Sequence, residues 1–276
     1  MFIRCANHDL DLSEPRVMGI LNVTPDSFSD GGKFIKPSDA LKHALRMVGE
    51  GAAVIDVGGE STRPGAEPVS LQQELDRVIP IIESLADKIP VPVSIDTSKP
   101  VVMREAAAAG AGMINDVAAL SAEGAIEAAS ESQLPVCLMH MQGEPRSMQQ
   151  QPQYKDVVLD VSGYLQQRVQ ACMAAGIPAH HILLDPGFGF GKSLRHNLLL
   201  LQNLESFAAA GHPLLVGLSR KSMIGRILGD RCVEQRLFGS LAAAVIAAMK
   251  GASILRVHDV RATVDAMRVT TAVMNQ

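Results

Sequence analysis

The chain has 276 residues, of which 47% are hydrophobic and 20% charged; this composition is typical of an ordinary folded domain and excludes extensive disorder. Its formal net charge is −4 and it has no cluster of lysine or arginine, which argues against a nucleic-acid surface because phosphate-backbone binding needs concentrated positive charge. Cys5, Cys137, Cys172 and Cys232 form no C-x-x-C pair, so they favour a reducing compartment over a disulfide framework or zinc site.

The N-terminal stretch MFIRCANHDLDLSEP lacks the apolar run and the cleavage site of a signal peptide. No other segment approaches the roughly 20 apolar residues that a membrane-spanning helix needs. We therefore expect a cytoplasmic protein without a membrane partner. Before Val17, the FIR and LDL segments on either side of Asn7, His8 and Asp9 predict a short β-hairpin.

From Val17 onward the chain repeats a short apolar run, a polar or glycine-rich turn, and a segment with helical periodicity. The runs are nearly continuously apolar, which is typical of parallel strands that helices cover on both faces. The eight runs are VMGILNV from Val17, AVIDV from Ala53, VPVSIDT from Val91, MINDV from Met113, VCLMH from Val136, ILLDP from Ile182, LLVGLS from Leu214 and ILRVHD from Ile254.

Between these runs, apolar residues recur at helical spacing. Two such stripes are Leu71, Leu75, Val78, Ile79 and Ile82, and Val157, Val161, Leu165, Val169 and Cys172. Asn22 in the first run and Arg256 in the eighth are seven units apart, which gives about 33 residues per unit, a typical βα repeat length.

Eight such units predict an α/β fold, a (β/α)8 TIM barrel formed by a single domain over residues 1–276. The N-terminal hairpin is expected to cover the bottom of the barrel. A doubly wound open sheet is the alternative fold, because local patterns do not show whether a sheet closes.

Polar residues occur where the apolar runs end. In a barrel, these positions surround the C-terminal mouth, where such enzymes place their chemistry. A shared ligand is favoured over three separate helix caps for Asp96, Asn115 and Asp185 together, whereas for Asp56 function and capping are equally supported. The full set is Asn22, Asp56, Asp96, Asn115, His140, Asp185, Ser219, Arg256 and His258.

The stretch DPGFGFGKS, from Asp185 to Ser193, comes close to two nucleotide-binding motifs and matches neither. A P-loop requires glycine at position 186, which is Pro186, and the dinucleotide motif requires glycine at position 192, which is Lys192. We expect these glycines to let the backbone leave the barrel tightly beside a ligand. Lys192 and Ser193 are expected to begin the following helix.

Two loops carry long motifs: GILNVTPDSFSDGG, residues 19–32, and DVGGESTRPGA, residues 56–66. With the strand-end Asp96, Asn115 and Asp185, the GLSRKS segment and the final RVHD, these loops closely resemble the dihydropteroate synthase family. That family joins 6-hydroxymethyl-7,8-dihydropterin diphosphate to 4-aminobenzoate in folate biosynthesis and releases diphosphate. The resemblance covers nearly the whole chain and implies a transferase, in the form of a homodimer.

The resemblance implies that Asp96, Asn115, Asp185 and Lys221 form the pterin pocket. Carboxylate and amide oxygens match the hydrogen-bond donors on the pyrimidine edge of a pterin, and an ammonium group matches its acceptors. The resemblance further assigns Thr62 and Arg63 to the pterin diphosphate, Asn22 to Mg²⁺, and Phe28, Pro64, Phe190 and Ser219 to 4-aminobenzoate.

Arg256 and His258 are separated by one residue, so their side chains are expected on the same face of the last strand, where they would hold the diphosphate. The aromatic amine needs no strong base, and departure of the diphosphate is the difficult step. Mg²⁺, Arg256 and His258 would stabilise the charge that develops there, and Lys221 completes the expected catalytic set. A dissociative, cation-like route is expected over tight displacement.

Three other functions compete with this interpretation. A pterin-dependent methyltransferase would bind a related ring but would need no diphosphate clamp such as Arg256 and His258. Loss of Asn22, Lys221 or the Arg-Val-His triplet that begins at Arg256 would suggest a binding module that only sequesters pterin, but all of these residues are present. A P-loop nucleotidase is disfavoured by the glycine spacing in DPGFGFGKS.

Overall fold

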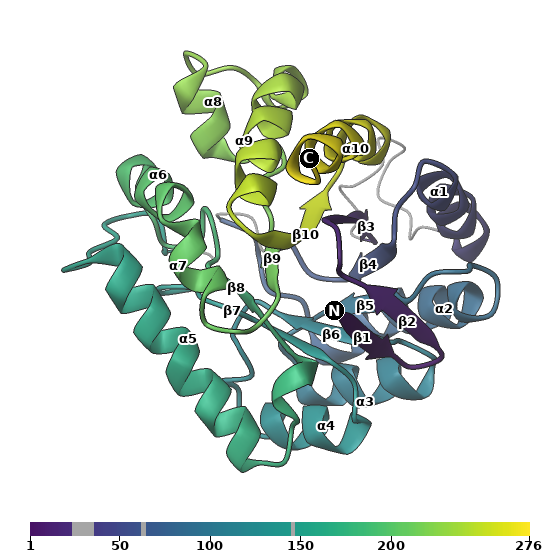
Figure 1. Ribbon diagram of the computed structural model, residues 1–276. Coiled ribbons are helices and arrows are strands. Elements are labelled where there is room, and N and C mark those ends of the chain that lie inside the picture. Colours follow the sequence, from purple (N-terminus) through teal and green to yellow (C-terminus); the bar gives the residue numbers. More distant parts are fainter. Residues whose placement is uncertain (24–35, 62–64, 145–146) are drawn as a thin grey trace.

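Eight parallel strands form a closed barrel in the order β10-β3-β4-β5-β6-β7-β8-β9, with helices around it (Figure 1). The computed structural model describes residues 1–23, 36–61, 65–144 and 147–276. Each strand overlaps one of the predicted apolar runs, and closure of the sheet rules out the open-sheet alternative. The strands are β3 (Arg16–Asn22), β4 (Val54–Gly58), β5 (Val93–Asp96), β6 (Met113–Asp116), β7 (Val136–Met139), β8 (Ile182–Asp185), β9 (Leu214–Val216) and β10 (Ala252–Val257).

Helices follow the strands and form the outer layer of the barrel (Figure 1). They are α1 (Pro37–Gly49), α2 (Leu71–Ala86), α3 (Pro100–Ala108), α4 (Ala125–Ser132), α5 (Val157–Ala174), α6 (Leu194–Gln202), α7 (Leu204–Ala208), α8 (Ser222–Ile227), α9 (Leu237–Met249) and α10 (Val260–Met274), with the short 3-10 helices η1 (Ala179–His181) and η2 (Val233–Gln235). Within the described ranges, none of the helices is long and apolar enough to cross a membrane.

The two predicted stripes mark the inner faces of α2 and α5. All five stripe residues of α5 are buried, and in α2 Val78 and Ile82 are buried, whereas Leu71 is exposed at the first helical position. Local signals also place the helix starts: the Ser70 hydroxyl accepts a hydrogen bond from the Gln73 backbone N–H at 3.2 Å in a capping box, and the Asp156 carboxylate caps α5.

The alternation of side chains along each strand divides the core into two parts. Outward-facing residues such as Val57, Ile95 and Leu138 pack in the cluster under the helices, whereas inward-facing residues form a smaller cluster inside the barrel. Because the period of a strand is two, the polar residues two positions beyond the inner cluster also face the interior, at the mouth. These are Asp56 after Val54, Asn115 after Met113, Asp185 after Leu183 and Arg256 after Ile254.

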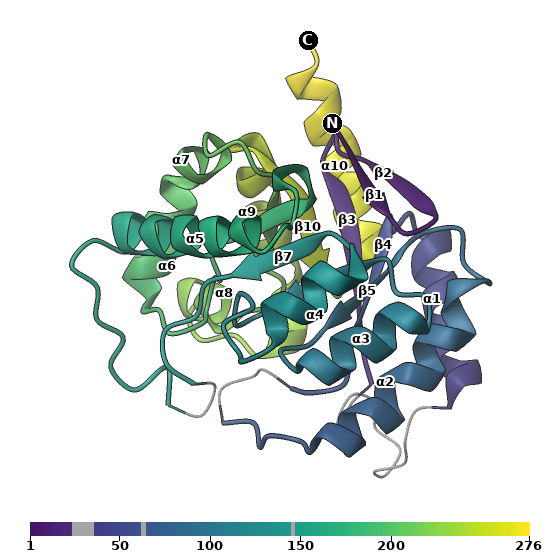
Figure 2. The same cartoon turned by 90° about the horizontal axis from the view of Figure 1, so that it is seen from below.

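The N-terminal hairpin closes the other end of the barrel, as predicted. Strand β1 (Phe2–Cys5) pairs antiparallel with β2 (His8–Asp11), and the hairpin lies across one end of the molecule (Figure 2). Its buried side chains, including Ile3, Cys5 and Leu10, belong to the same apolar cluster as the inward-facing residues of the barrel strands. Functional side chains therefore gather at the opposite end, where the strands terminate.

Candidate active site

Arg256 joins two strand-end carboxylates across the mouth of the barrel. Its Nε lies 2.6 Å from Oδ2 of Asp56, and its Nη2 lies 2.7 Å from Oδ2 of Asp96. The Asn115 Nδ2 donates to the same Asp56 oxygen at 3.3 Å. Asp56, whose role the sequence left undecided, is completely buried, and its Oδ1 has no hydrogen-bond partner within the described part of the chain. Asp56 therefore holds both Arg256 and Asn115 in place.

Burial sets the charge states in this cluster. Burial raises the pKa of Asp96 to about 7, because it penalises the carboxylate by more than the nearby Arg256 stabilises it. Burial also works against the guanidinium, but the neighbouring Asp56 and Asp96 outweigh it and raise the pKa of Arg256. Arg256 therefore stays charged, whereas Asp96 can exchange a proton near neutral pH.

Strand register places Asn22 in the same row as the pterin-binding candidates of β5 and β6. Asn22 pairs with Gly58, Gly58 with Asp96, and Asp96 with Asn115. A Cβ atom on Gly58 would lie 3.7 Å from Asn22 Oδ1 and 3.7 Å from Asp96 Oδ2. The glycine thus leaves a small space between two side-chain oxygens.

On the other side of the mouth, the side chains of Lys221, which follows β9, and of Asp185, which ends β8, both contact the loop after β8. Lys221 directly precedes α8, and its Nζ donates to the carbonyl oxygen of Phe188 and lies 4.3 Å from the centroid of the Phe190 ring. Asp185 Oδ1 accepts a hydrogen bond from the Gly187 N–H at 2.7 Å. A Cβ on Gly187, which has a φ of +71°, would lie 1.9 Å from the His140 carbonyl oxygen, so this tight turn requires glycine.

The Lys221 ammonium and the Asp185 carboxylate influence each other's protonation. Burial lowers the pKa of Lys221 to about 8, although the nearby Asp185 opposes this shift. Burial likewise raises the pKa of Asp185, against the influence of Lys221. Among the described residues, the mouth therefore presents the Lys221 ammonium, the Arg256 guanidinium and several carboxylates, and the charge of each group depends on its neighbours.

Ser219 and His258 connect the ends of β9 and β10. The Ser219 Oγ accepts a hydrogen bond from the His258 backbone N–H at 3.2 Å and lies 3.1 Å from His258 Nδ1. The next residues are joined as well, because Arg220 forms two hydrogen bonds, of 2.8 and 2.6 Å, with the Asp259 carboxylate. The imidazole of His258 is exposed, whereas Arg256 faces the carboxylates, so the two predicted diphosphate ligands have different surroundings.

Sequence reasoning missed the role of Lys192. Ser193 caps α6 as expected, but the Lys192 side chain is buried in the loop. Its Nζ lies 2.9 Å from His140 Nδ1 and donates to the carbonyl oxygens of Gly187 at 2.9 Å and Phe190 at 3.0 Å. Burial, followed by the charge of Lys192, lowers the pKa of His140 to about 3, so this imidazole is neutral and can accept the hydrogen bond. The glycine spacing argued against a phosphate-binding role for Lys192, but no pattern in the sequence predicted its contacts with His140 and with the carbonyl oxygens of its own loop.

The structure thus brings together Asn22, Asp96, Asn115, Asp185, Lys221 and Arg256 at the barrel mouth, with Phe190, Ser219 and His258 on the adjoining turns. Phe28, Thr62, Arg63 and Pro64, which the sequence assigns to the two substrates, lie outside the described residues.

Comparisons with known proteins agree with this geometry. A family model described as "Pterin binding enzyme" matches residues 18–258. The dihydropteroate synthase of Escherichia coli strain K12 is 59% identical over 266 residues, which cover 96% of this chain and 94% of that protein.

Solved structures extend the similarity to three dimensions. Yersinia pestis dihydropteroate synthase with a sulfonamide drug complex has a TM-score of 0.96 and 54% identity, with 100% of both chains covered. Xanthomonas albilineans dihydropteroate synthase in complex with 7,8-dihydropteroate has a TM-score of 0.91 and 48% identity, covering 100% of each chain. This chain therefore belongs to the dihydropteroate synthase family of pterin-binding enzymes.

Proposed function

We propose that this chain is a transferase that joins 6-hydroxymethyl-7,8-dihydropterin diphosphate to 4-aminobenzoate, forming a C–N bond. The products are 7,8-dihydropteroate, an intermediate of folate biosynthesis, and diphosphate. One observation carries this proposal: Asp96, Asn115 and Asp185 converge with Lys221 at the barrel mouth, in a chain that closely matches a synthase structure containing 7,8-dihydropteroate.

The pterin ring is held by side chains from three strands and one turn. Asp96, Asn115 and Asp185 supply oxygens for the amino and ring N–H donors of the pyrimidine edge, and Lys221 donates to its acceptors. Hydrogen bonds with a charged partner contribute about 1.5–3 kcal/mol each, so two or three of them are sufficient for specific binding. The hydrogen bond from Gly187 to Asp185 fixes the orientation of that carboxylate before the ligand arrives.

Arg256 and His258 act on the diphosphate. The hydrogen bonds of Arg256 to Asp56 and Asp96 orient its guanidinium and leave other N–H groups to donate to a phosphate oxygen. The same two carboxylates offset its positive charge, so Arg256 alone does not balance a departing diphosphate. The exposed imidazole of His258 can donate a further hydrogen bond, and additional positive charge is needed.

The surroundings of Asn22 fit a magnesium ion as the source of that charge. Mg²⁺ prefers oxygen ligands and commonly combines one or two protein oxygens with substrate phosphates. Asn22 Oδ1 is such an oxygen, and Gly58 leaves space beside it. Within the described residues no group of three or more His, Cys, Asp or Glu side chains could hold a metal, so the diphosphate would supply the other ligands. A bound Mg²⁺ would offset the charge on the leaving group.

The metal assignment can be tested by binding of the pterin diphosphate with and without Mg²⁺. Wild-type protein should bind it more tightly with the ion, and Asn22→Ala should remove that difference. An equal effect of Mg²⁺ on both proteins would refute the role of Asn22.

The amine substrate is expected beside the pterin, in contact with Phe190 and Ser219. The position of Phe190 next to the Lys221 ammonium supports this, because the ring borders the proposed pterin site. Phe28 and Pro64 belong to the same proposal. Ser219→Ala should raise the KM for 4-aminobenzoate while leaving pterin affinity unchanged.

Bond breaking is proposed to run ahead of bond making at the pterin methylene carbon. The C–O bond to diphosphate breaks first, the electron-rich pterin delocalises the positive charge, and the neutral amine then attacks and loses its proton. Arg256 and His258 stabilise the charge where it develops. A large secondary isotope effect at the methylene is expected, and a rate that depends strongly on amine basicity would contradict this route.

A homodimer is also proposed. Helices α9 and α10 carry several large apolar side chains that are exposed on this chain: Phe238, which is 80% exposed, and Met249, Val269 and Val273. Sedimentation should give twice the monomer mass, and Phe238→Asp should shift it toward the monomer.

A cytoplasmic location and a single-domain organisation are also proposed. The free thiols Cys5, Cys137 and Cys172 are buried, which is compatible with a reducing cytoplasm, and cell fractionation would test this location. A single domain should unfold in one calorimetric transition.

The decisive experiment for the function is an assay for diphosphate release by purified protein. Release should require both the pterin diphosphate and 4-aminobenzoate, and Arg256→Gln should abolish it. Release with the pterin substrate alone would indicate a hydrolase instead.

A further inference from the structure

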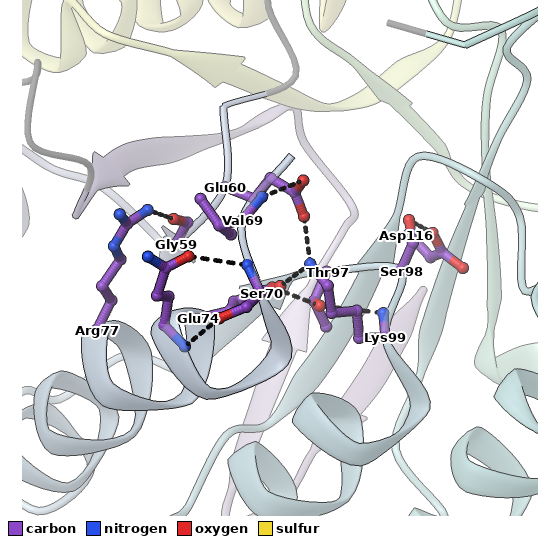
Figure 3. A network of polar contacts seen from close by, with 11 residues as sticks. Gly59, Glu60, Val69, Ser70, Glu74, Arg77, Thr97, Ser98, Lys99 and Asp116 are labelled. Atoms are coloured by element: carbon purple, nitrogen blue, oxygen red, sulfur yellow. Dashed lines mark hydrogen bonds and ion pairs between the residues drawn. The ribbon is translucent and has the colours of Figure 1, made fainter. Parts of the chain in front are cut away.

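Glu60 connects three backbone segments just beyond the end of β4. Its Oε1 accepts a hydrogen bond from the Val69 backbone N–H at 3.2 Å, and its Oε2 accepts one from the Lys99 ammonium (Figure 3). Val69 immediately precedes Ser70, which caps α2. The first contact therefore joins the two ends of the segment 61–68, and the second attaches those ends to the turn after β5.

Lys99 in turn connects Glu60 to a fully buried carboxylate on α2. Its Nζ lies 2.5 Å from Glu74 Oε2, and the Glu74 side chain is only 1% exposed. The other Glu74 oxygen accepts a hydrogen bond from the Thr97 hydroxyl at 2.6 Å. Burial works against the ammonium, but the hydrogen bonds to Glu60 and Glu74 outweigh it and raise the pKa of Lys99. The Lys99 ammonium therefore forms ion pairs with two carboxylates, the partly exposed Glu60 and the buried Glu74.

The same turn is tied to the strand ends of the proposed pterin site. Thr97 follows Asp96, and its backbone N–H donates to the Asn115 carbonyl oxygen at 3.1 Å. Ser98 donates to Asp116 Oδ1 at 2.5 Å, and Asp116 follows Asn115 (Figure 3). The contacts of Glu60 thus lead, through Lys99 and Thr97, to the backbone that carries two pterin-binding side chains.

We propose that Glu60, Lys99 and Glu74 are positioning residues for the transferase reaction, which hold the two ends of segment 61–68 in register with the strand ends of Asp96 and Asn115. This inference rests on the proposed function. None of these three residues is needed to contact a substrate; they act through the backbone that they join.

The chemistry of Glu60 provides a specific test. A carboxylate has two acceptor oxygens, and Glu60 uses one for Val69 and the other for Lys99. A carboxamide of the same shape has one acceptor and one donor, so Glu60→Gln must lose one of the two contacts. Glu60→Gln also removes one of the two negative charges that share the Lys99 ammonium. Because Glu74 remains paired with Lys99, the fold should not be destabilised.

In Glu60→Gln, kcat/KM for 4-aminobenzoate should fall roughly tenfold to a hundredfold, as expected when reacting groups are misplaced by a distant change. The affinity for 6-hydroxymethylpterin, which lacks the diphosphate, should stay unchanged, because Glu60 does not touch Asp96, Asn115 or Asp185. The melting temperature should also be retained. Lys99→Met should reduce kcat/KM similarly but also lower the melting temperature, because Glu74 is left without its cation; Lys99→Arg should restore most of both.

Glu131→Gln is the matched control, because it removes the same charge from an exposed ion pair, which Glu131 of α4 forms with Arg104 of α3. It should behave as the wild type does. Unchanged kcat/KM in Glu60→Gln, or an equal loss of pterin affinity, would overturn the proposal.

Hydrogen exchange separates this proposal from the proposed function. In Glu60→Ala, which removes both acceptor oxygens, the Val69 amide should exchange faster than in the wild type, whether or not the protein turns over substrate. If the wild-type protein releases no diphosphate but this difference appears, the proposed reaction fails and the structural link stands. If exchange at Val69 is unchanged, the link itself is refuted.

Discussion

Replacement of Asp185 by asparagine should weaken pterin binding without unfolding the protein. Within the described residues, the hydrogen bonds of this carboxylate involve only Oδ1, which accepts from the Gly187 N–H at 2.7 Å. In Asp185→Asn, the amide oxygen keeps that contact, and the NH2 group takes the place of Oδ2. A donor then faces the donors of the pterin edge, and a charge-assisted hydrogen bond is lost. That loss is worth about 1.5–3 kcal/mol, or roughly a 10- to 100-fold rise in Kd.

The fold should tolerate this change because burial raises the pKa of Asp185 and so already disfavours its charged form. Calorimetry with 6-hydroxymethylpterin measures the Kd, and thermal unfolding confirms that the variant is folded. Asp116→Asn is the matched control: Asp116 is also buried, but its oxygens accept from Ser98, Ala118 and Leu120. It should lose stability and keep its pterin affinity. An unchanged Kd in folded Asp185→Asn would refute the role of Asp185.

Three further changes test other parts of the site. The pKa of Lys221 is about 8, so its ammonium is present below that pH and lost above it. Pterin affinity measured by calorimetry should therefore fall as the pH rises through about 8. This fall should be absent in Lys221→Met. Lys192→Met should leave the carbonyl oxygens of Gly187 and Phe190 without their buried donor. The free energy of unfolding in urea titrations should then fall by about 1–3 kcal/mol. A loss of catalytic activity without a loss of stability would contradict this. Gly187→Ala should reduce both stability and pterin affinity. Backbone strain at the positive φ of this position costs about 1–3 kcal/mol, and the added Cβ would collide with the His140 carbonyl oxygen. A melting temperature equal to that of the wild type would contradict the tight turn.

Periodicity alone predicted the framework of this fold because strands and helices impose local repeats on a sequence. The buried stripe of α5, from Val157 to Cys172, and the hairpin before Val17 were both confirmed. Polar residues at the ends of apolar runs also identified the strand ends that face the barrel mouth, such as Asp96 and Asn115. Their assignment to pterin, and that of Arg256 and His258 to diphosphate, remain predictions.

Long-range pairing was not accessible from the sequence. Arg256 lies 200 residues from Asp56 and 160 from Asp96, and no local pattern indicates that one guanidinium joins both carboxylates. Lys192 was expected to begin a helix, and no pattern in the sequence singled out Glu74. Their burial becomes evident only when the loop after β8 packs on His140 and α2 packs beside Lys99.

The sequence by itself determined the number and order of the βα units, the residues at the strand ends, and the resemblance to one enzyme family. Tertiary structure decided that the sheet closes, that Asp56 holds Arg256 and Asn115, and that one ammonium joins Glu60 to Glu74. The physical reason is that hydrophobic periodicity reports which face of each element is buried. The partner of a buried charge depends instead on which distant elements the closed barrel brings together, and an unpaired buried charge is too costly to remain.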